Sequence, residues 1–477
     1  MKKIELLIFA AIILLALILR LYKIDRPLAD WHSWRQADTA AVARNFIKEG
    51  YTPFVPKFDD MSAQANGQNN PNRYRFVEFP IYNSIVAAVW LVTGVSTLSA
   101  RLVTVAITIA STIFLYLVVK HFSQWETAAL AAFFFATIPY NVFYSSTILP
   151  GPFMVFSLLA LYYFFIKFLQ KENFVFLFLS VIFTNLALLS WPIAVFFLLP
   201  IAYLTLEKYG LKGIKNYKLW IYAILSVLPL LAWRIWILKF PAGIPNWRFL
   251  INEGNIRFKG AFFRWILAER LGKLILTVGG FALATIGVIK KPGNEKLFYY
   301  SLFASCILYV SIFASGNVRH DYYQIPLIPI AAIFMAIGTR WLVDFKSSLL
   351  NKYVSLTVVV FLLFLMYALG WYEVQGYYWI NKPQIITAGE AADRLLPKDA
   401  TVVAPYNGDS AFLYATNRYG YPIVDRPLTT LVGEGTKYLV TVDVEDAGIK
   451  NIIANCIVLE KTTDYAILEM TQECLQR

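Results

Sequence analysis

The chain has 477 residues, of which 58% are hydrophobic, 17% aromatic and only 15% charged. Soluble globular domains average about 25% charged residues, so the composition excludes an ordinary soluble protein and indicates a polytopic membrane protein. The formal net charge of +13 would suggest nucleic-acid binding in a soluble domain. Here the Lys and Arg residues gather in short loops between apolar runs, and we expect no nucleic-acid partner.

The membrane-spanning segments are indicated by apolar runs, because a transmembrane helix needs about 20 mostly apolar residues. Eleven runs reach or approach this length. They cover residues 4–22, 102–119, 127–144, 153–169, 174–190, 192–206, 219–238, 271–289, 297–315, 322–342 and 353–372. A twelfth run, Ile81 to Val95, is shorter and follows Glu78 and Pro80. We predict that this run is an interfacial helix that does not cross the bilayer.

The first apolar run follows Lys2 and Lys3, as the apolar part of a secretory signal peptide also would. It is followed by no small-residue cleavage site and leads into Arg20, Tyr22 and Lys23. We therefore predict an uncleaved first span.

The orientation follows from lysines in alternate loops. With a cytoplasmic N-terminus and eleven spans, residues such as Lys120, Lys171 and Lys208 lie in cytoplasmic loops, while the turns at 140–151 and 190–191 contain no Lys or Arg. Positive residues favour the cytoplasmic side of a membrane. The sequence thus predicts a multi-pass protein of the cell (plasma) membrane with an external C-terminus.

Residues 380–477 differ from the rest in being less apolar and in containing short β-type runs. The runs are Ala400–Ala404, Tyr438–Val442, Ile452–Leu459 and Tyr465–Glu469, and helical stretches fit Thr387–Leu396 and Asp409–Tyr414. We predict a transmembrane module over residues 1–375, which includes a first external loop at 23–100, and a small external (extracytoplasmic) α/β domain over 380–477. Cys456 and Cys474 either form a disulfide in an oxidising compartment or are two unpaired cysteines.

Carboxylates concentrate in the first external loop, where the sequence LADWHSWRQAD holds Asp30 and Asp38, and Glu78 follows further along. A carboxylate partly shielded from water at the membrane surface can act as a general base on a hydroxyl. Asp38 precedes TAAVARNFI, so it could equally cap a helix, or do both. Asp30 could be a solvated turn residue, and Glu78 could simply pair with Arg75 or Arg101.

Cations on the same external side include Arg35, Arg101 and Arg319. Guanidinium groups bind phosphate oxygens in a bidentate fork, so a phosphate or pyrophosphate ligand would explain them. The alternative is a set of interfacial arginines whose head groups reach the water.

His32 and His320 also fall on the external side, and Tyr322 follows His320 in the turn GNVRHDYYQIP. The two histidines could join Asp30 and Asp38 in a metal site, but no two of them have the spacing of a helical ligand pair. We therefore assign no metal ligand and expect His32, His320 and Tyr322 to shape a substrate site. A bound divalent cation remains an alternative.

The predicted spans hold almost no charge at mid-depth, since Arg20, Arg101 and Arg234 lie near their ends. Ion-coupled transporters usually keep ionisable residues and broken helices there. The pattern therefore argues against a pump and favours chemistry at one face of the membrane.

The order of several short motifs resembles the GT-C superfamily of glycosyltransferases, in particular the protein O-mannosyltransferases, the aminoarabinose transferases and a dolichyl-phosphate-mannose-type subgroup. The motifs are HSWRQADTAAVARNF, EFPIY, GVSTLSARL and RHDYYQIPLIP, and the resemblance covers roughly residues 1–372. It implies a GT-C fold in the cell envelope and a donor sugar carried on polyprenyl phosphate. It also implies an acidic residue of the first external loop as base on the acceptor, and an inverting transfer.

The sequence departs from that pattern at two places. Many relatives have an adjacent Asp-Glu pair where this chain has Arg35-Gln36, and Glu78 replaces a basic residue often found before the proline of the next motif. We expect Asp38 to be the general base, with Asp30 second and Glu78 third. Arg35, Arg101 and Arg319 are expected to hold the donor phosphate.

The sequence thus predicts a glycosyltransferase that moves a sugar from a polyprenyl-phosphate donor to a hydroxyl of a lipid, glycan or protein. The alternatives are a lipid-linked oligosaccharide ligase or polymerase with a diphosphate donor, and a non-enzymatic lipid or polysaccharide transporter.

Overall fold

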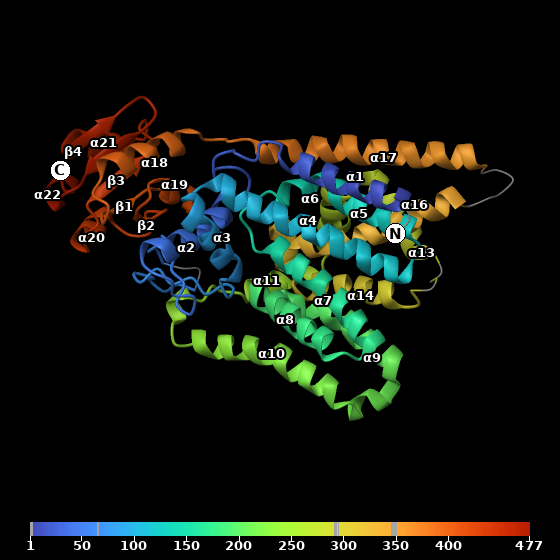
Figure 1. Ribbon diagram of the computed structural model, residues 1–477. Helices are drawn as coiled ribbons and strands as arrows, with labels where there is room; N and C mark the ends of the chain where they lie inside the picture. The colour runs from blue at the N-terminus through green and yellow to red at the C-terminus, as the bar shows by residue number, and fades with distance from the viewer. Residues whose placement is uncertain (1–2, 64–65, 291–292, 294, 345–350) are drawn as a thin grey trace. The chain divides into compact units, whose positions relative to one another are not determined.

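The computed structural model describes residues 3–63, 66–290, 293, 295–344 and 351–477 (Figure 1). The chain divides into two compact units. Unit 1 comprises Met1–Ile24, Arg101–Ile235 and Trp247–Gly376, and unit 2 comprises Asp25–Ala100, Trp236–Asn246 and Tyr377–Arg477. Most of the predicted external loop 23–100 thus groups with the C-terminal domain. The functional boundary at residues 375–380 stays a prediction.

Unit 1 is helical, and a few of its helices extend slightly past the unit boundaries. Its main helices are α1 Lys3–Arg20, α4 Thr97–Phe122, α5 Trp125–Thr137, α6 Pro139–Tyr144, α7 Gly151–Lys171, α8 Phe174–Ser190, α9 Leu199–Tyr209, α10 Tyr217–Ile237, α11 Phe249–Asn252, α12 Gly260–Phe263, η5 Arg264–Ile275, α13 Thr277–Ile289, α14 Phe298–Ile312, α15 Ala314–Arg319, η6 Asp321–Leu327, α16 Ile328–Asp344 and α17 Lys352–Val374. Each of the eleven predicted spans is helical over most of its length.

The chain is a helical polytopic membrane protein. Six of the described helices are long and apolar enough to cross a bilayer: 97–122, 151–171, 192–215, 217–237, 321–344 and 352–378. A seventh span results if Gly260–Ile275 and Thr277–Ile289, which are bent by 113°, count as one. The remaining predicted spans are shorter or, like α1, carry three charged residues, so the number eleven stays a prediction.

Close packing of α13 against α16 in unit 1 depends on a glycine in each helix. A Cβ atom on Gly287 of α13 would lie 1.9 Å from the Phe334 carbonyl oxygen of α16. A Cβ atom on Gly338 of α16 would lie 2.0 Å from the Leu283 carbonyl oxygen of α13. Small residues allow such approach between membrane helices, where packing rather than the hydrophobic effect drives association.

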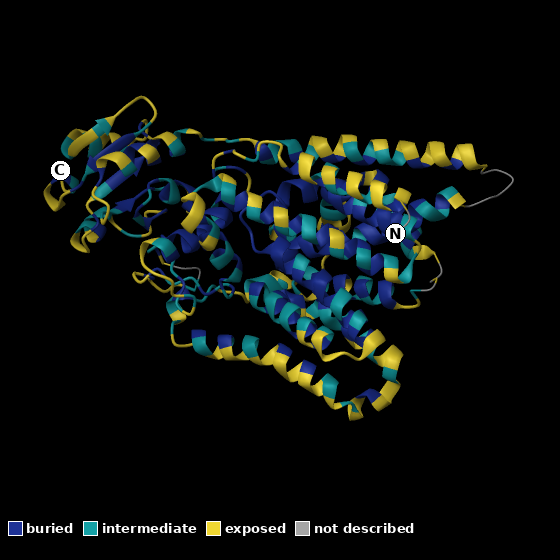
Figure 2. Cartoon of the chain, in the orientation of Figure 1, coloured by how far each residue is buried: buried dark blue, intermediate teal, exposed yellow. Residues whose placement is uncertain are grey.

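Burial separates central from peripheral helices in unit 1 (Figure 2). In the apolar stretches of η6–α16 and α7, 83% and 78% of the residues are buried. In those of α10 and α17 the share is 22%. Apolar side chains such as Ile235 and Phe364 are more than 60% exposed. Large exposed apolar faces on helices of this length are what a lipid-facing surface requires.

Unit 2 contains α2 Ser33–Lys48, α3 Ile81–Thr93 and a mixed α/β domain. The run predicted to be interfacial forms α3, whose 13 residues rise about 20 Å at 1.5 Å per residue. That is shorter than the roughly 30 Å hydrocarbon core of a bilayer. The length therefore supports the prediction that α3 does not cross.

The α/β domain has a five-stranded sheet in the order β2-β1-β3-β5-β4. The strands are β1 Thr401–Val403, β2 Tyr419–Tyr421, β3 Tyr438–Thr441, β4 Ile457–Lys461 and β5 Ala466–Glu469. Its helices are α18 Gln384–Leu395, α19 Ser410–Ala415, α20 Leu428–Gly433, α21 Ala447–Asn455 and α22 Gln472–Leu475. β1 pairs in parallel with β2 and β3, while β5 pairs antiparallel with β3 and β4.

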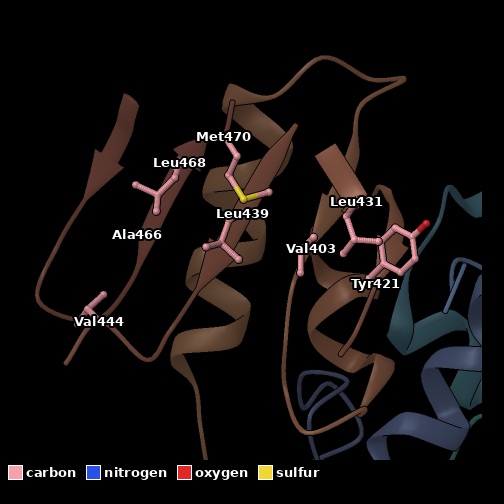
Figure 3. Packing of buried hydrophobic residues seen from close by; sticks show 8 residues of the cluster. All are labelled: Val403, Tyr421, Leu431, Leu439, Val444, Ala466, Leu468 and Met470. Atoms are coloured by element: carbon pink, nitrogen blue, oxygen red, sulfur yellow. The ribbon is translucent and has the colours of Figure 1, made fainter. Parts of the chain in front are cut away.

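One face of the sheet forms an apolar core (Figure 3). The buried residues of this cluster are Val403, Tyr421, Leu431, Leu439, Val444, Ala466, Leu468 and Met470. Met61 of the first external loop also packs against it. The loop and the sheet therefore share one core.

The first external loop also joins the sheet by backbone hydrogen bonds at β2. Gly420 N donates to the Asp59 carbonyl oxygen at 3.0 Å, and Met61 N donates to the Gly420 carbonyl oxygen at 2.7 Å. Gly420 is required here, because a Cβ atom would lie 1.8 Å from the Val402 carbonyl oxygen and its φ is 154°. These bonds fix the loop segment 59–61 to the sheet edge.

The predicted strand Ile452–Leu459 was wrong over its first half. Residues up to Asn455 belong to α21, which starts after Asp446 because that side chain accepts a hydrogen bond from Ile449 N at 3.0 Å. An N-cap of this kind satisfies a free backbone donor of the first turn. Strand β4 begins only at Ile457.

Cys456 and Cys474 form a disulfide with Cα atoms 5.0 Å apart. Replacing both residues by Ser should lower the free energy of unfolding of the α/β domain by about 3 kcal/mol, because a crosslink closing a loop of this length restricts the unfolded chain. Chemical denaturation followed by far-UV circular dichroism measures this change. Replacement of the buried Cys306 by Ser is the comparison for loss of a thiol alone. Equal denaturation midpoints for the wild type and the double variant would contradict the expectation.

Candidate functional site

Helix α2 is a polar helix that is almost completely buried. Of its 16 residues, 13 are buried, among them Arg35, Gln36, Asp38 and Arg44. Burying a charged group is costly unless it is paired and hydrogen-bonded. Each of these side chains does have a partner within unit 2, which makes α2 the centre of a preorganised polar network.

Asp38 lies in the interior of α2 and is not its N-cap, since the helix begins at Ser33. The interpretation of Asp38 as a helix cap was therefore wrong. Its Oδ1 accepts a hydrogen bond from Ser410 Oγ at 2.7 Å, and its Oδ2 lies 2.7 Å from Arg75 Nη2. The carboxylate is thus held in place by the external loop and by α19 of the α/β domain.

Asp60 is a second carboxyl group in this network. Burial, together with the negative charge of Asp38, raises the pKa of Asp60 to about 6, against the opposing effects of Ser62 and Arg75. Its Oδ1 accepts a hydrogen bond from Ser62 N at 2.7 Å, and the residue remains partly exposed. A partly exposed carboxyl group with a pKa near the working pH has the properties of a general base.

The other two predicted carboxylates are engaged by arginines. Asp30 forms an ion pair with Arg26 and accepts from Gln36 Nε2 at 2.8 Å. Both oxygens of Glu78 lie close to Arg35 Nη2, at 2.8 and 2.9 Å. The structure thus brings the predicted base Glu78 and the predicted phosphate ligand Arg35 together as a buried pair.

His32 directly precedes α2 and has a left-handed backbone conformation with a φ of 53°. Its ring packs edge-on against Trp31, with centroids 5.1 Å apart. Within the described ranges, no group of three or more His, Cys, Asp or Glu side chains could hold a metal ion.

The remaining predicted residues lie in unit 1. Arg101 is fully buried in α4 and donates from Nη1 to the Ile24 carbonyl oxygen at 3.2 Å. Arg319 is half exposed at the end of α15 and pairs with Glu253. The predicted phosphate ligands therefore differ strongly in exposure.

His320 and Tyr322 belong to an aromatic stack at the start of η6. Their ring centroids are 5.4 Å apart, and Tyr322 also stacks on Trp191 at 6.3 Å. Between them, the buried Asp321 accepts a hydrogen bond from Tyr144 Oη at 2.7 Å. The turn therefore presents ordered aromatic rings beside a buried carboxylate.

The sequence of residues 78–236 matches the profile of the family described as dolichyl-phosphate-mannose-protein mannosyltransferase. Among solved structures, ArnT from Cupriavidus metallidurans bound to undecaprenyl phosphate has a TM-score of 0.65 at 14% identity, covering 99% of both chains. The archaeal oligosaccharyltransferase AglB from Archaeoglobus fulgidus, in complex with an inhibitory peptide and a dolichol-phosphate, has a TM-score of 0.60 at 11% identity. That match covers 98% of this chain and 74% of AglB. No curated protein gives a significant match.

The family match covers residues 78–236, about a third of the chain. The two structural likenesses, at 14% and 11% identity, show a shared membrane-protein fold. The family resemblance and the class of enzyme predicted from the sequence are confirmed. The roles of the individual site residues stay predictions.

Several polar residues of the candidate site were missed by the sequence interpretation. They are Asp59 and Asp60 of the external loop, Asp321 of η6, and Asp409 and Ser410 of the α/β domain. Three of these carboxylates, Asp59, Asp60 and Asp321, lie in the sequences FDDM and RHDYYQIP. Both sequences belong to regions that we predicted to be external. Nothing in the sequence indicated that Ser410 would contact Asp38, since 372 residues separate them.

Ser410→Ala is expected to lower kcat about fivefold, because Asp38 loses one of its two fixed hydrogen-bond donors, a contribution of about 1 kcal/mol. The KM for the donor should stay the same, since the hydroxyl positions a side chain and does not bind substrate. Steady-state kinetics of sugar transfer measure both constants. Ser410→Thr keeps the hydroxyl and should restore kcat; an equal loss in both variants would point to a packing defect instead.

Proposed function

We propose that this chain is a GT-C glycosyltransferase that transfers a sugar from a polyprenyl-phosphate donor to a hydroxyl group of a lipid, glycan or protein acceptor, with inversion at the anomeric carbon. The proposal draws on the lipids bound in the similar structures, undecaprenyl phosphate in ArnT and dolichol-phosphate in AglB. It also draws on the buried carboxylates of unit 2.

The raised pKa of the Asp60 carboxyl group is the single observation that carries the chemical part of the proposal. With a pKa of about 6, its carboxylate is ionised at neutral pH and yet more basic than an ordinary aspartate. Asp38 accepts hydrogen bonds from both Ser410 and Arg75, which suits it to fixing charge and geometry. Two neighbouring carboxyl groups with different environments commonly divide such roles. Asp60 thus joins Asp38, Asp30 and Glu78 as a candidate base, and we place it first.

The reaction balances without a general acid. The acceptor O–H gives its proton to the carboxylate, the acceptor oxygen bonds to the anomeric carbon, and the bond from that carbon to the phosphate oxygen breaks. The polyprenyl phosphate leaves with the bonding electron pair. A phosphate monoester has a second pKa near 6, so it needs compensating positive charge rather than a proton.

For that positive charge we propose Arg101 and Arg319 as ligands of the donor phosphate. Guanidinium groups suit this role because they offer several N–H donors in a planar fork. Arg35 is a weaker candidate than the sequence suggested, because its ion pair with Glu78 is buried, whereas the ion pair of Arg319 with Glu253 is half exposed and open to exchange for a phosphate. His320 and Tyr322 are proposed to line the sugar site, and His32 stays a proposed substrate-site residue of unit 2.

We further propose eleven spans with a cytoplasmic N-terminus, and unit 2 on the external face. Lysine-rich loops on one side support this orientation. The Cys456–Cys474 disulfide supports it as well, because such bonds persist outside the reducing cytosol.

The test uses the full-length protein in lipid nanodiscs with a polyprenyl-phosphate sugar labelled in the sugar. Mass spectrometry of the released lipid should find polyprenyl monophosphate, and the label should appear in a lipid, glycan or peptide acceptor. Release of a diphosphate, or movement of the lipid across the membrane without a new glycosidic bond, would overturn the proposal. A parallel reaction with a chelator shows whether a divalent cation takes part.

A further inference from the structure

The α/β domain contains a crevice that the proposed chemistry does not use. Its volume is about 550 Å³, within the range of small-molecule sites. It is lined by Pro405, which follows β1, by residues 441–446, which include the last residue of β3 and the loop after it, and by Thr463 and Asp464 of the β4–β5 hairpin. All of these segments belong to unit 2.

The crevice occupies the place where sheets of this kind bind ligands. β1 pairs in parallel with both β2 and β3. After β1 the chain continues to β2 on one side of the sheet, and after β3 it continues to β4 and β5 on the other side. This is the point where the strand order reverses, and the carboxyl ends of the parallel strands open a gap there. The crevice is therefore a consequence of the topology and not a surface irregularity.

The lining indicates the chemistry of the occupant. It contains four carboxylates, those of Asp443, Glu445, Asp446 and Asp464, and one lysine, Lys382. Lys382 Nζ is paired with Asp443 Oδ1 at 2.6 Å, so the remaining charge is negative and disfavours an anionic ligand.

The carboxylates of the crevice differ in whether they already pair with another group of the domain. Glu445 is paired with Lys450 at 2.7 Å, and Asp446 caps α21. Asp464 has no ion pair within the described part of the chain and is exposed at the tip of the hairpin. Together with the hydroxyl of Thr463, it can accept hydrogen bonds from hydroxyl or amine groups of a ligand.

A short loop connects the crevice with the acidic network around Asp38. Residues 404–409 run from the end of β1, past Pro405 in the wall of the crevice, to Asp409, which accepts a hydrogen bond from Ser33 Oγ at 2.6 Å. The next residue, Ser410, donates to Asp38. A ligand seated against Pro405 therefore contacts the segment that positions Asp38.

We infer that this crevice binds a neutral or amine-bearing saccharide unit of the acceptor, away from the hydroxyl that receives the sugar. The inference rests on the proposed function only in taking the bound saccharide to be part of the acceptor. Binding in the crevice does not itself require sugar transfer. It assigns to the α/β domain the selection of carbohydrate-containing acceptors and the rejection of anionic ones.

The test measures binding of three trisaccharides to the full-length protein in nanodiscs, without donor, by isothermal titration calorimetry. The probes are maltotriose, which is neutral, the glucosamine trimer, which bears amines, and trigalacturonate, which is anionic. We expect the glucosamine trimer to bind most tightly, maltotriose more weakly, and trigalacturonate not at all. Asp464→Asn should weaken the glucosamine trimer about tenfold.

Glu434→Gln is the matched control, since it removes one negative charge from the exposed surface of the same domain outside the crevice. It should bind the trimer as the wild type does. Thr463→Trp, which fills the crevice, should abolish binding of both neutral and amine-bearing probes. Equal affinity in Asp464→Asn and Glu434→Gln, tight binding of trigalacturonate, or no binding of any probe by the wild type would each overturn the inference. Because no donor is present, these outcomes are independent of whether sugar transfer is observed.

Discussion

Asp60→Asn is expected to lower kcat/KM for sugar transfer by about 100- to 10,000-fold, the usual contribution of a general base. The amide keeps the size of the side chain but cannot take the proton of the acceptor hydroxyl. Transfer from labelled polyprenyl-phosphate sugar measures the loss, and donor affinity measured separately should be unchanged. Asp399→Asn, an exposed aspartate of the same unit, should retain full activity.

The pH profile of transfer distinguishes Asp60 from the other carboxylates. Because the pKa of Asp60 is about 6 and only the ionised form accepts a proton, the rate should rise between pH 5 and pH 7 and then level off. Asp38→Asn removes a negative charge that raises this pKa, so the midpoint of the remaining activity should move to lower pH. If Asp60→Asn is fully active and Asp38→Asn is inactive, Asp38 is the base, as the sequence suggested.

The helical architecture was predictable because apolar runs and lysine-rich loops are local signals. All eleven predicted spans fall on helices, and the short run after Glu78 became the separate helix α3. Strand β2 was missed because three residues, Tyr-Gly-Tyr, carry no alternation of apolar and polar side chains. Its place in the sheet depends on pairing with β1, which is a tertiary contact.

The sequence could indicate the segment that contains the candidate site, but not the individual residues that make it up. The charged segment LADWHSWRQAD leads into α2, whose polar side chains are buried, and its catalytic role stays a prediction. The pKa of Asp60 depends on burial and on Asp38, 22 positions earlier, and no local pattern reports such an effect. The pairing of Arg35 with Glu78 had no local signal either, since the two residues lie 43 positions apart.

Arg44→Ala is expected to lower the free energy of unfolding of unit 2 by about 3–5 kcal/mol, the cost of leaving a buried charge without its partner. Arg44 and Asp59 form an ion pair whose side chains are only 6% and 3% exposed. Arg44 also stacks on Tyr414, with its Cζ 3.9 Å from the ring centroid, and donates from Nη1 to the Tyr414 carbonyl oxygen at 2.9 Å. Pulse proteolysis across a urea gradient measures the change.

The matched control is Arg394→Ala, which breaks the ion pair with Glu460 at a site where the arginine is 64% exposed. Exposed pairs contribute about 0–1 kcal/mol, so this variant should unfold close to the wild type. The double variant Arg44→Met/Asp59→Leu removes both buried charges and should recover much of the stability, because an apolar pair leaves no unpaired charge. If the double variant is as unstable as Arg44→Ala, the loss comes from the contacts with Tyr414. In that case the arginine joins α2 to α19 chiefly by stacking and by its bond to the backbone, and the charge of Asp59 is secondary.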